Sequence, residues 1–287
     1  RGVQKGIEKL SNVLMPLLFV ILLALCVVAF TLPGAAEGLE YFLSPDFSKI
    51  TPSVFINALG QTFFSLSLGM GILVTYASYY PVSANLPKTS FTVALLSLLV
   101  AVLMGCVIFP AVMTFGLQNE SLEGATLIFV TLPEVFARLP LSQLWSALFF
   151  LLLLVAAITS TVSIAEVAIA FLCDRLGMQR RNAVLAALCP MFLLSSLCSL
   201  SLGPLNGFTI FGRTLFDFLD NFATNILLPI VSIGTCLYVG WFGPRRLLHR
   251  QLSNCGTLRS RLTGVITFIL RYIAPVLIAA ILLGRWL

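Results

Sequence analysis

The stretch TFFSLSLGMG at residues 62–71 places two serines and two glycines in the middle of an apolar run, Ser53 to Tyr80. Glycine in a helix interior costs about 1 kcal/mol relative to alanine. In hydrocarbon, a broken helix survives only where protein or a polar cavity satisfies its freed backbone groups. Discontinuous helices of this kind bind ions and substrates near the midplane of many secondary transporters. Close helix packing through small-xxx-small spacing is the alternative interpretation.

The composition of the chain indicates a membrane protein. The 287 residues are 59% hydrophobic and 10% charged, whereas soluble domains are about a quarter charged. A spanning helix needs about 20 apolar residues, and a soluble all-α core would have to hide seven such segments. We therefore predict an all-α polytopic membrane protein with about seven transmembrane helices, at residues 12–33, 53–80 (broken near 65–69), 89–117, 144–173, 183–203, 214–242 and 263–284.

Lysine and arginine are distributed unevenly over the predicted connections. With the amino end inside, the external segments carry Lys49, Arg138, Arg213 and Arg285. All other basic residues are then internal: Arg1, Lys5, Lys9, Lys88, Arg175, Arg180, Arg181, Arg245, Arg246, Arg250, Arg259, Arg261 and Arg271. Cytoplasmic loops are enriched in Lys and Arg, so we predict a cytoplasmic amino end and an external carboxyl end. The net charge of +6 favours an anionic inner leaflet over nucleic acid as the partner.

The segments outside the predicted helices have distinct compositions. The chain opens at Arg1 with the basic stretch RGVQKGIEKL, and the apolar run that follows is longer than that of a secretory signal. We expect a fragment of a longer protein that has lost upstream sequence. Residues 34–52 are predicted to form an external acidic loop and residues 243–262 an internal basic one. In the external connection 118–143, LIFVTLPEVFARL is apolar enough to fold back as short helices.

The residues needed for enzymatic or structural metal chemistry are scarce. The 7 cysteines form no CxxC pair, so neither a metal site nor a disulfide framework is indicated. The single histidine, His249, lies in the basic loop. Because the predicted helices hold no nucleophile–base pair, we predict that the chain is not an enzyme.

A second polar pattern lies in AAITSTVSIAEV, residues 156–167. Ala156, Thr159, Ser160 and Ser163 are spaced i, i+3, i+4 and i+7, which is one helix face. Hydroxyl and carbonyl oxygens are hard ligands suited to hard cations. The alternative is that these hydroxyls bond carbonyls of their own helix.

Three long motifs in the same order resemble the neurotransmitter:sodium symporter family, and most closely its bacterial amino-acid transporters with the LeuT fold. They are ALGQTFFSLSLGMGILVTYASYY (58–80), AAITSTVSIAEVAIAFLCDRLG (156–177) and GPLNGFTIFGRTLFDFLDNFATNILLPI (203–230). The resemblance covers almost the whole chain. It implies that the seven segments correspond to the fifth through eleventh helices of the family. The first four, missing amino-terminal helices of the same protein, would be partners of this fragment.

The resemblance implies a role for individual residues. For the substrate it implies an aromatic lid, hydroxyl contacts and the walls of a side-chain pocket, at Phe64, Ser65, Ser67, Met70, Ser160 and Ile164. It implies two Na⁺ sites, the first with Ser65 and Ser97 and the second with Ala156, Thr159 and Ser160. It also implies an outer gate with Gln61 and Asp220. The inner gate would hold Asp174, with Tyr79 near it, and its arginine would lie on the missing segment.

Ser97 departs from the family pattern. It stands where bacterial relatives usually place Asn or Asp near the first sodium ion, and Ala101, one turn later, stands where some carry Glu. In this family the absent carboxylate is often linked to dependence on Cl⁻. A weakened first sodium site and a neutral substitution are the alternatives.

Two further carboxylates are open to more than one interpretation. Glu166 lies inside a predicted span, where ionisable side chains are functional candidates. A structural partner on a neighbouring helix is favoured over proton coupling. Asp217 is interpreted as a solvated residue at a helix end, whereas Asp220 is predicted to be a gate residue.

The function that the resemblance implies is sodium-coupled symport of neutral hydrophobic amino acids across the plasma (bacterial inner) membrane, by alternating access. In the family, the first, second, sixth and seventh helices rock against the rest. Only two of these four are expected in this chain, so we do not expect it to transport alone. The alternative is a degenerate, non-transporting relative that acts as a membrane scaffold or sensor. The intact hydroxyls at Ser65, Ser67, Thr159 and Ser160 favour transport, and Ser97 favours the alternative.

Overall fold

The computed structural model describes residues 8–81, 84–117, 128–129, 132–137, 141–243 and 263–284. The predictions that involve Arg1, Lys5, Arg138, Arg285, most of loop 118–143 and nearly all of loop 243–262, including His249, lie outside these residues. By their internal contacts, residues 1–48 and 95–162 form one compact unit, and residues 49–94 and 163–287 form the other. The former is the first unit and the latter is the second unit.

The first unit is a bundle of apolar helices. It contains α1 (Glu8–Phe30), α2 (Ala35–Leu43), the 3₁₀ turn η2 (Phe47–Lys49) and α7 (Leu132–Ala137). It also holds most of α5 (Leu86–Phe115) and the first part of α8 (Ser142–Leu176). The core joins α1, α5, α7 and α8 through Ile21, Leu22, Leu25, Cys26, Cys106, Val107, Leu132, Phe136, Phe149 and Leu152.

Glycines allow α2 to lie close to α5. A Cβ at Gly38 would lie 2.5 Å from the backbone nitrogen of Pro110, and a Cβ at Gly105 would overlap the Phe42 ring. Phe42 stacks on Phe109 with ring centroids 4.9 Å apart. The prediction of a loop at residues 34–52 is wrong for Ala35–Leu43, which form α2, and these residues, AAEGLEYFL, are mostly good helix formers.

The second unit holds the broken segment and the carboxyl-terminal helices. It contains α3 (Pro52–Ser65), α4 (Ile72–Ser78), the end of α8 and α9 (Arg180–Ser201). A short antiparallel hairpin, β1 (Thr209–Ile210) and β2 (Arg213–Thr214), pairs Thr209 with Thr214. The long helix after it comprises α10 (Leu215–Phe222), η4 (Ala223–Leu227), α11 (Leu228–Leu237) and η5 (Tyr238–Phe242). The last helix comprises α13 (Thr263–Phe268), η6 (Ile269–Ile273) and α14 (Ala274–Gly284).

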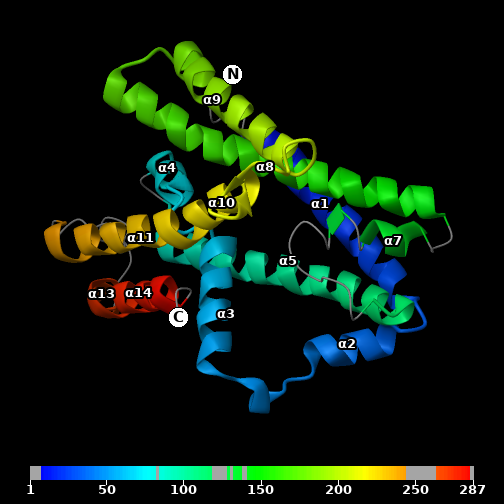
Figure 1. The fold of residues 1–287 in the computed structure, drawn as a ribbon. Coiled ribbons are helices and arrows are strands. Elements are labelled where there is room, and N and C mark those ends of the chain that lie inside the picture. Colours follow the sequence, from blue (N-terminus) through cyan, green and yellow to red (C-terminus); the bar gives the residue numbers. More distant parts are fainter. Residues whose placement is uncertain are drawn as a thin grey trace. The chain divides into compact units, whose positions relative to one another are not determined.

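In the second unit, the carboxyl-terminal helices pack against each other and against α3, the first half of the broken helix. α11 packs along α14, and α14 packs against α3 (Figure 1). Small residues let α8 and α9 approach, with Ala165, Ile169, Ala183 and Ala187 buried between them. This follows the rule that small side chains permit close helix contact in membranes.

Each of the segments η4, η5 and η6 is a π-helical turn. Each of them ends two residues before a proline in the sequence: η4 before Pro229, η5 before Pro244 and η6 before Pro275. Proline lacks the N–H that would bond the carbonyl four residues earlier. A widened turn is one way in which a helix accommodates that loss.

Among the described residues, six helices are long and apolar enough to cross a membrane. They are Glu8–Phe30, Leu86–Phe115, Ser142–Leu176, Arg180–Ser201, Leu215–Phe242 and Gly264–Gly284. The predicted segment 53–80 is divided into α3 and α4, each too short to span alone. The chain is therefore a helical, multi-pass membrane protein with one interrupted helix.

Candidate functional site

The interruption extends from Leu66 to Gly71. α3 is started by Thr51, whose hydroxyl accepts from the Val54 N–H at 3.4 Å, and it ends at Ser65. The next amides fold back onto the last turn, with Ser67 N–H donating to the Phe64 carbonyl at 2.9 Å. α4 then begins at Ile72. The predicted break at 65–69 therefore lies within a residue or two of the observed one.

Left-handed backbone at three positions produces this break. Ser67, Gly69 and Gly71 have φ values of 54°, 80° and 78°. Glycine adopts such values without strain, whereas a residue with a Cβ rarely does. Ser67 is thus a non-glycine residue in a conformation that occurs mostly at turns and functional sites.

Close packing of the break against α11 also requires a glycine. A Cβ at Gly69 would lie 2.6 Å from the Leu228 carbonyl oxygen and still closer to the hydroxyl of Ser232. Ser232 is 6% exposed, and its hydroxyl has no hydrogen-bond partner in the part of the chain that the structure describes. The sequence does not single out Ser232, because a lone serine in an apolar helix gives little signal.

The predicted substrate residues around the break lie in the second unit. Phe64 is 47% exposed, while Ser67 and Met70 are half-buried. The Ser65 hydroxyl donates to the Thr62 carbonyl at 3.1 Å, which leaves its oxygen lone pairs as acceptors. Ile164 on α8 is exposed and belongs to the same unit.

The predicted second sodium site lies on α8 in the first unit. The Thr159 hydroxyl donates to the Ala156 carbonyl at 2.9 Å, so the bond within its own helix is present. Thr159 and Ala156 are half-buried, and Ser160 is exposed. Ser97, half-buried on α5, belongs to the first unit as well. The two ion sites remain predictions.

Two tyrosines attach α4 to α8. The Tyr76 hydroxyl lies 2.9 Å from the Ser163 hydroxyl. The Tyr79 hydroxyl donates to Oε1 of Glu166 at 2.8 Å. The carboxyl-terminal half of the broken helix is therefore held to α8 by two polar contacts, one from Tyr76 in α4 and one from Tyr79, the residue that follows it.

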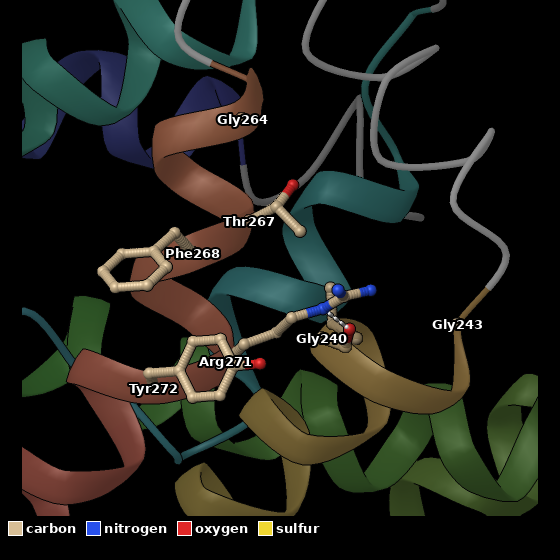
Figure 2. Close-up of a pocket in the computed structure, with 8 residues that line it drawn as sticks. Gly240, Gly243, Gly264, Thr267, Phe268, Arg271 and Tyr272 are labelled. Atoms are coloured by element: carbon tan, nitrogen blue, oxygen red, sulfur yellow. Dashed lines mark hydrogen bonds between the residues drawn. The ribbon is translucent and has the colours of Figure 1, made fainter.

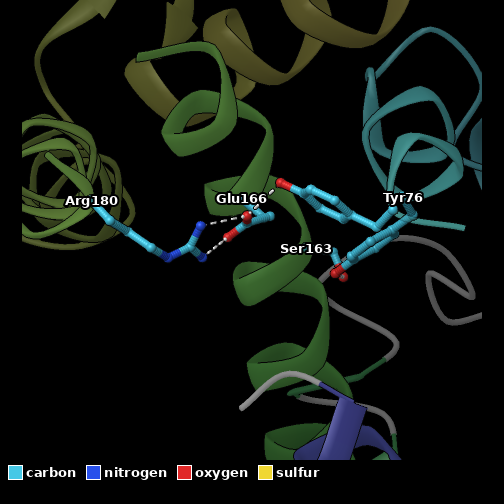
Figure 3. Close-up of polar contacts among 5 residues, drawn as sticks. Tyr76, Ser163, Glu166 and Arg180 are labelled. Atoms are coloured by element: carbon cyan, nitrogen blue, oxygen red, sulfur yellow. Dashed lines mark hydrogen bonds and ion pairs between the residues drawn. The ribbon is translucent and has the colours of Figure 1, made fainter. Parts of the chain in front are cut away.

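Glu166 is the centre of a charged network. It is 2% exposed and accepts from Nη1 and Nη2 of Arg180 at 3.1 and 2.6 Å. Figure 3 shows its carboxylate facing Arg180 on α9. The hydroxyl of Tyr79, the residue after α4, donates to the same carboxylate. A structural partner on a neighbouring helix, the favoured interpretation, is therefore present. The two-pronged Arg–carboxylate geometry is the strongest form of such a pair.

Among the residues that the structure describes, no hydrogen bond or ion pair joins the predicted gate residues to one another. Tyr79, expected near Asp174, donates a hydrogen bond to Glu166, and Asp174 is exposed near the end of α8. Gln61 and Asp220 are both exposed, and no hydrogen bond links their side chains within the described ranges. Their gating roles remain predictions.

Asp217 belongs to a helix cap. The Thr214 hydroxyl donates to Asp217 Oδ2 at 2.7 Å and accepts from the Asp217 N–H at 3.2 Å. This arrangement satisfies a free amide at the start of α10. The interpretation of Asp217 as a helix end is supported.

A bundle of apolar helices, one of them interrupted in its apolar centre by left-handed glycines, defines a membrane transport protein of the discontinuous-helix class. The chain belongs to the sodium:neurotransmitter symporter family, whose sequence model matches residues 1–286. Members of this family are transporters and not enzymes.

Individual relatives agree with this assignment. An uncharacterized sodium-dependent transporter of Haemophilus influenzae is 38% identical over 286 residues, which are 99% of this chain and 62% of that protein. An uncharacterized sodium-dependent transporter of Bacillus subtilis is 36% identical over 284 residues, again 99% and 62%. The crystal structure of MhsT in complex with L-phenylalanine matches with a TM-score of 0.85 and 38% identity, covering 99% of this chain and 64% of that one. The chain thus has the LeuT-type fold of MhsT and spans less than two thirds of the length of these relatives.

Proposed function

We propose that this chain is the larger part of a sodium-coupled symporter that carries neutral hydrophobic amino acids across the bacterial plasma membrane by alternating access. The observation that carries the proposal is the break at Leu66–Gly71. Its left-handed residues Ser67, Gly69 and Gly71 turn the backbone out of the helix in the middle of an apolar segment. Such a break frees carbonyls and amides, which are the groups that bind ions and carboxylates in transporters.

Sodium binds, in this proposal, at two sites. The second uses the Ala156 carbonyl and the hydroxyls of Thr159 and Ser160, and the first uses Ser65 with Ser97. The hydrogen bond from Thr159 to Ala156 supports the site because it brings the hydroxyl next to the Ala156 carbonyl, and oxygens of both kinds are hard ligands suited to hard cations. Ser65, and also Ser160, would contact both cation and substrate. Each ligand then raises affinity for the other, by reciprocal linkage. The membrane potential adds about 2.3 kcal/mol per charge per 100 mV.

The substrate would be bound by apolar side chains and the break. Phe64 would cover it, Met70 and Ile164 would line its side chain, and Ser67 would lie beside its carboxylate. An apolar pocket rejects charged side chains because an unpaired buried charge is costly. The likeness to MhsT, whose structure contains L-phenylalanine, supports a hydrophobic amino acid.

Gating and orientation complete the proposal. Gln61 and Asp220 would close the outer side, and Asp174 the inner side together with Tyr79. The distribution of Lys and Arg supports a cytoplasmic amino end and an external carboxyl end. Cl⁻ is a candidate ancillary ion because Ser97 and Ala101 supply no carboxylate near the first sodium site.

The test is sodium-driven uptake by the full-length protein in proteoliposomes. Thr159→Val with Ser160→Ala removes two hydroxyl ligands at nearly constant volume. We expect at least a tenfold loss of Na⁺-dependent uptake with unchanged membrane insertion. Ser195→Ala is the control, because that exposed hydroxyl on α9 bonds only the Phe192 carbonyl among the described residues. Uptake that keeps its Na⁺ dependence in the double variant would refute the second sodium site. Absence of uptake in the unaltered protein would favour the scaffold alternative.

A further inference from the structure

A cavity of about 330 Å³ lies in the second unit between the end of one helix and the start of the next. Figure 2 shows it between η5 and the α13–η6 segment, with Arg271 between them. Its other lining residues are Val239, Gly240, Gly243, Gly264, Thr267, Phe268 and Tyr272. None of them belongs to the proposed transport site.

Arg271 carries a charge within the last predicted span. It lies eight residues after Thr263, the first residue of α13, which corresponds to roughly 12 Å along a helix. A cation at such a depth is costly, so intramembrane ionisable residues are paired or functional. Arg271 is half-buried.

No carboxylate balances this charge in the part of the chain that the structure describes. The guanidinium Nε donates to the Gly240 carbonyl, and no bond from either Nη group is recorded there. Residues 244–262 and 285–287, which lie outside the described ranges, contain no Asp or Glu. Neither the described residues nor these two segments therefore supply a carboxylate that pairs with the guanidinium.

Two prolines explain why the side chain is held in place. Gly240 O would bond the amide of residue 244 in a continued helix, but that residue is Pro244. The Arg271 carbonyl is freed in the same way by Pro275, and it accepts from Trp241 Nε1 at 3.4 Å. The guanidinium carbon lies 5.8 Å from the centre of the Trp241 ring, within cation–π range. Arg271 is thus held by three contacts: its carbonyl accepts from Trp241, its Nε donates to Gly240, and its guanidinium lies over the Trp241 ring. These contacts leave Nη1 and Nη2 in a fixed position.

η5 and η6 approach closely at Arg271 because the residue opposite it is a glycine, Gly240. A Cβ at Gly240 would lie 3.0 Å from Arg271 Cγ. Tyr272 packs edge-on against Trp241, and Phe268 packs on Tyr272, with centroids 5.6 and 5.3 Å apart. Aromatic rings of this kind gather where membrane meets water. The Arg271 side chain reaches from its backbone to the Gly240 carbonyl, two residues before the end of η5, as long basic side chains do near an interface. The cavity therefore combines a cationic fork with ring side chains typical of the lipid headgroup level.

We propose that this cavity binds the phosphate of an anionic phospholipid from the inner leaflet, with Arg271 Nη1 and Nη2 as donors. A guanidinium matches phosphate oxygens two at a time. The assignment to the inner leaflet rests on the predicted orientation. The five arginines of residues 244–262 add to the attraction of this side for anionic lipid. The site is separate from the proposed sodium and amino-acid sites.

The first test is native mass spectrometry of the full-length protein in detergent, titrated with phosphatidylglycerol or with phosphatidylcholine of the same acyl chains. The unaltered protein should bind one phosphatidylglycerol at least tenfold more tightly than phosphatidylcholine. Arg271→Gln should reduce this preference to less than about twofold. The control Arg181→Gln removes the same charge from an exposed position on the predicted inner side and should keep the preference. Equal phosphatidylglycerol binding by Arg271→Gln and the unaltered protein would overturn the proposal.

A second test needs no change at Arg271. Phosphatidylglycerol with brominated acyl chains should quench the tryptophan fluorescence component that disappears in Trp241→Phe. Excess unlabelled phosphatidylglycerol should reverse this quenching. Inorganic phosphate and phosphatidylcholine should not. Reversal by inorganic phosphate would assign the cavity to free phosphate and refute the lipid, and quenching that is equal with brominated phosphatidylcholine would refute the preference for an anionic headgroup.

Discussion

Met70 is the residue that we expect to set the size of the substrate pocket. Methionine is unbranched and adapts to different shapes, whereas phenylalanine gives a stiffer wall. Met70→Phe should therefore penalise Trp and Phe as substrates more than Leu or Val, by several-fold. The measurement is competition of unlabelled amino acids against a labelled one in proteoliposomes. Met15→Phe, on an exposed face of α1, is the control. Equal loss of all substrates, or strong competition by Glu or Lys, would contradict this role.

Ser97 determines, in our proposal, whether uptake needs chloride. Where no carboxylate lies near the first sodium ion, an anion can supply the negative charge. We expect uptake to fall when chloride is replaced by gluconate, and Ser97→Asp or Ala101→Glu to restore it. Ser97→Ala adds no charge and should keep the chloride requirement. Chloride-independent uptake by the unaltered protein would leave a weakened sodium site as the interpretation of Ser97.

The sequence predicts single residues well where the signal is local and poorly where the role depends on packing between helices. The position of the break was predicted closely because glycine and serine spacing is a local signal. The sequence predicts that Tyr79 lies near Asp174, which stays a prediction, but it does not predict the bond from Tyr79 to Glu166. The two carboxylates lie on one helix eight residues apart, roughly 12 Å along its axis. Which of them meets the tyrosine depends on how α4 packs against α8, and that is not encoded locally.

The interrupted helix makes a prediction at the scale of the element. Gly69→Ala would place a side chain in left-handed backbone, at a cost of about 1–2 kcal/mol, and against the Leu228 carbonyl. We expect at least a tenfold loss of uptake, measured at equal surface expression. Gly234→Ala on α11 is the matched control, because nothing lies within 4 Å of its Cβ position. That change should be neutral or stabilising by up to about 1 kcal/mol. Normal uptake by Gly69→Ala would contradict the requirement for this backbone shape.

The contact between α4, α8 and α9 makes a second prediction at this scale. Glu166→Gln leaves the Arg180 guanidinium without its carboxylate. Losing one partner of a buried pair costs about 3–5 kcal/mol. Because the Arg180 side chain is 42% exposed, we expect a smaller loss, about 1–2 kcal/mol. The measurement is thermal unfolding in detergent, with Glu37→Gln, an exposed position on α2, as the control.

The double variant separates charge pairing from general damage to the contact. Glu166→Gln with Arg180→Gln removes both charges and should recover part of the lost stability, because the remaining amides can bond each other. A double variant that is as unstable as the sum of the two single variants would show that the ion pair does not join these helices.

Elements with a strong periodic or compositional signal were the ones predicted. Each of the seven predicted segments contains helix, because a long apolar run leaves few alternatives in lipid. α2 was missed since nine residues between two turns give a weak pattern. The π-helical turns were also missed. Their prolines are visible in the sequence, but whether a helix kinks, ends or widens at a proline is decided by the neighbours that satisfy the freed carbonyl.

For the whole molecule, family and fold follow from order and spacing of the motifs, whereas orientation depends on charge. Consecutive helices that each cross the membrane must alternate in direction, so one external position and one internal position suffice to test the predicted topology. Asn206, between α9 and α10, is exposed and predicted to be external. Cys255 belongs to residues 243–262, predicted to be internal, where arginines are concentrated.

We predict that a membrane-impermeant maleimide labels Asn206→Cys in intact cells and reaches Cys255 only after permeabilisation. Both are measured in full-length protein from which the other cysteines have been removed. The physical reason is that translocating a loop with several Lys and Arg residues is disfavoured, so such loops stay in the cytoplasm. A version that lacks both Asn206→Cys and Cys255 serves as the labelling control. Labelling of Cys255 in intact cells at the rate of Asn206→Cys would reverse the orientation, and the lipid bound at Arg271 would then have to come from the outer leaflet.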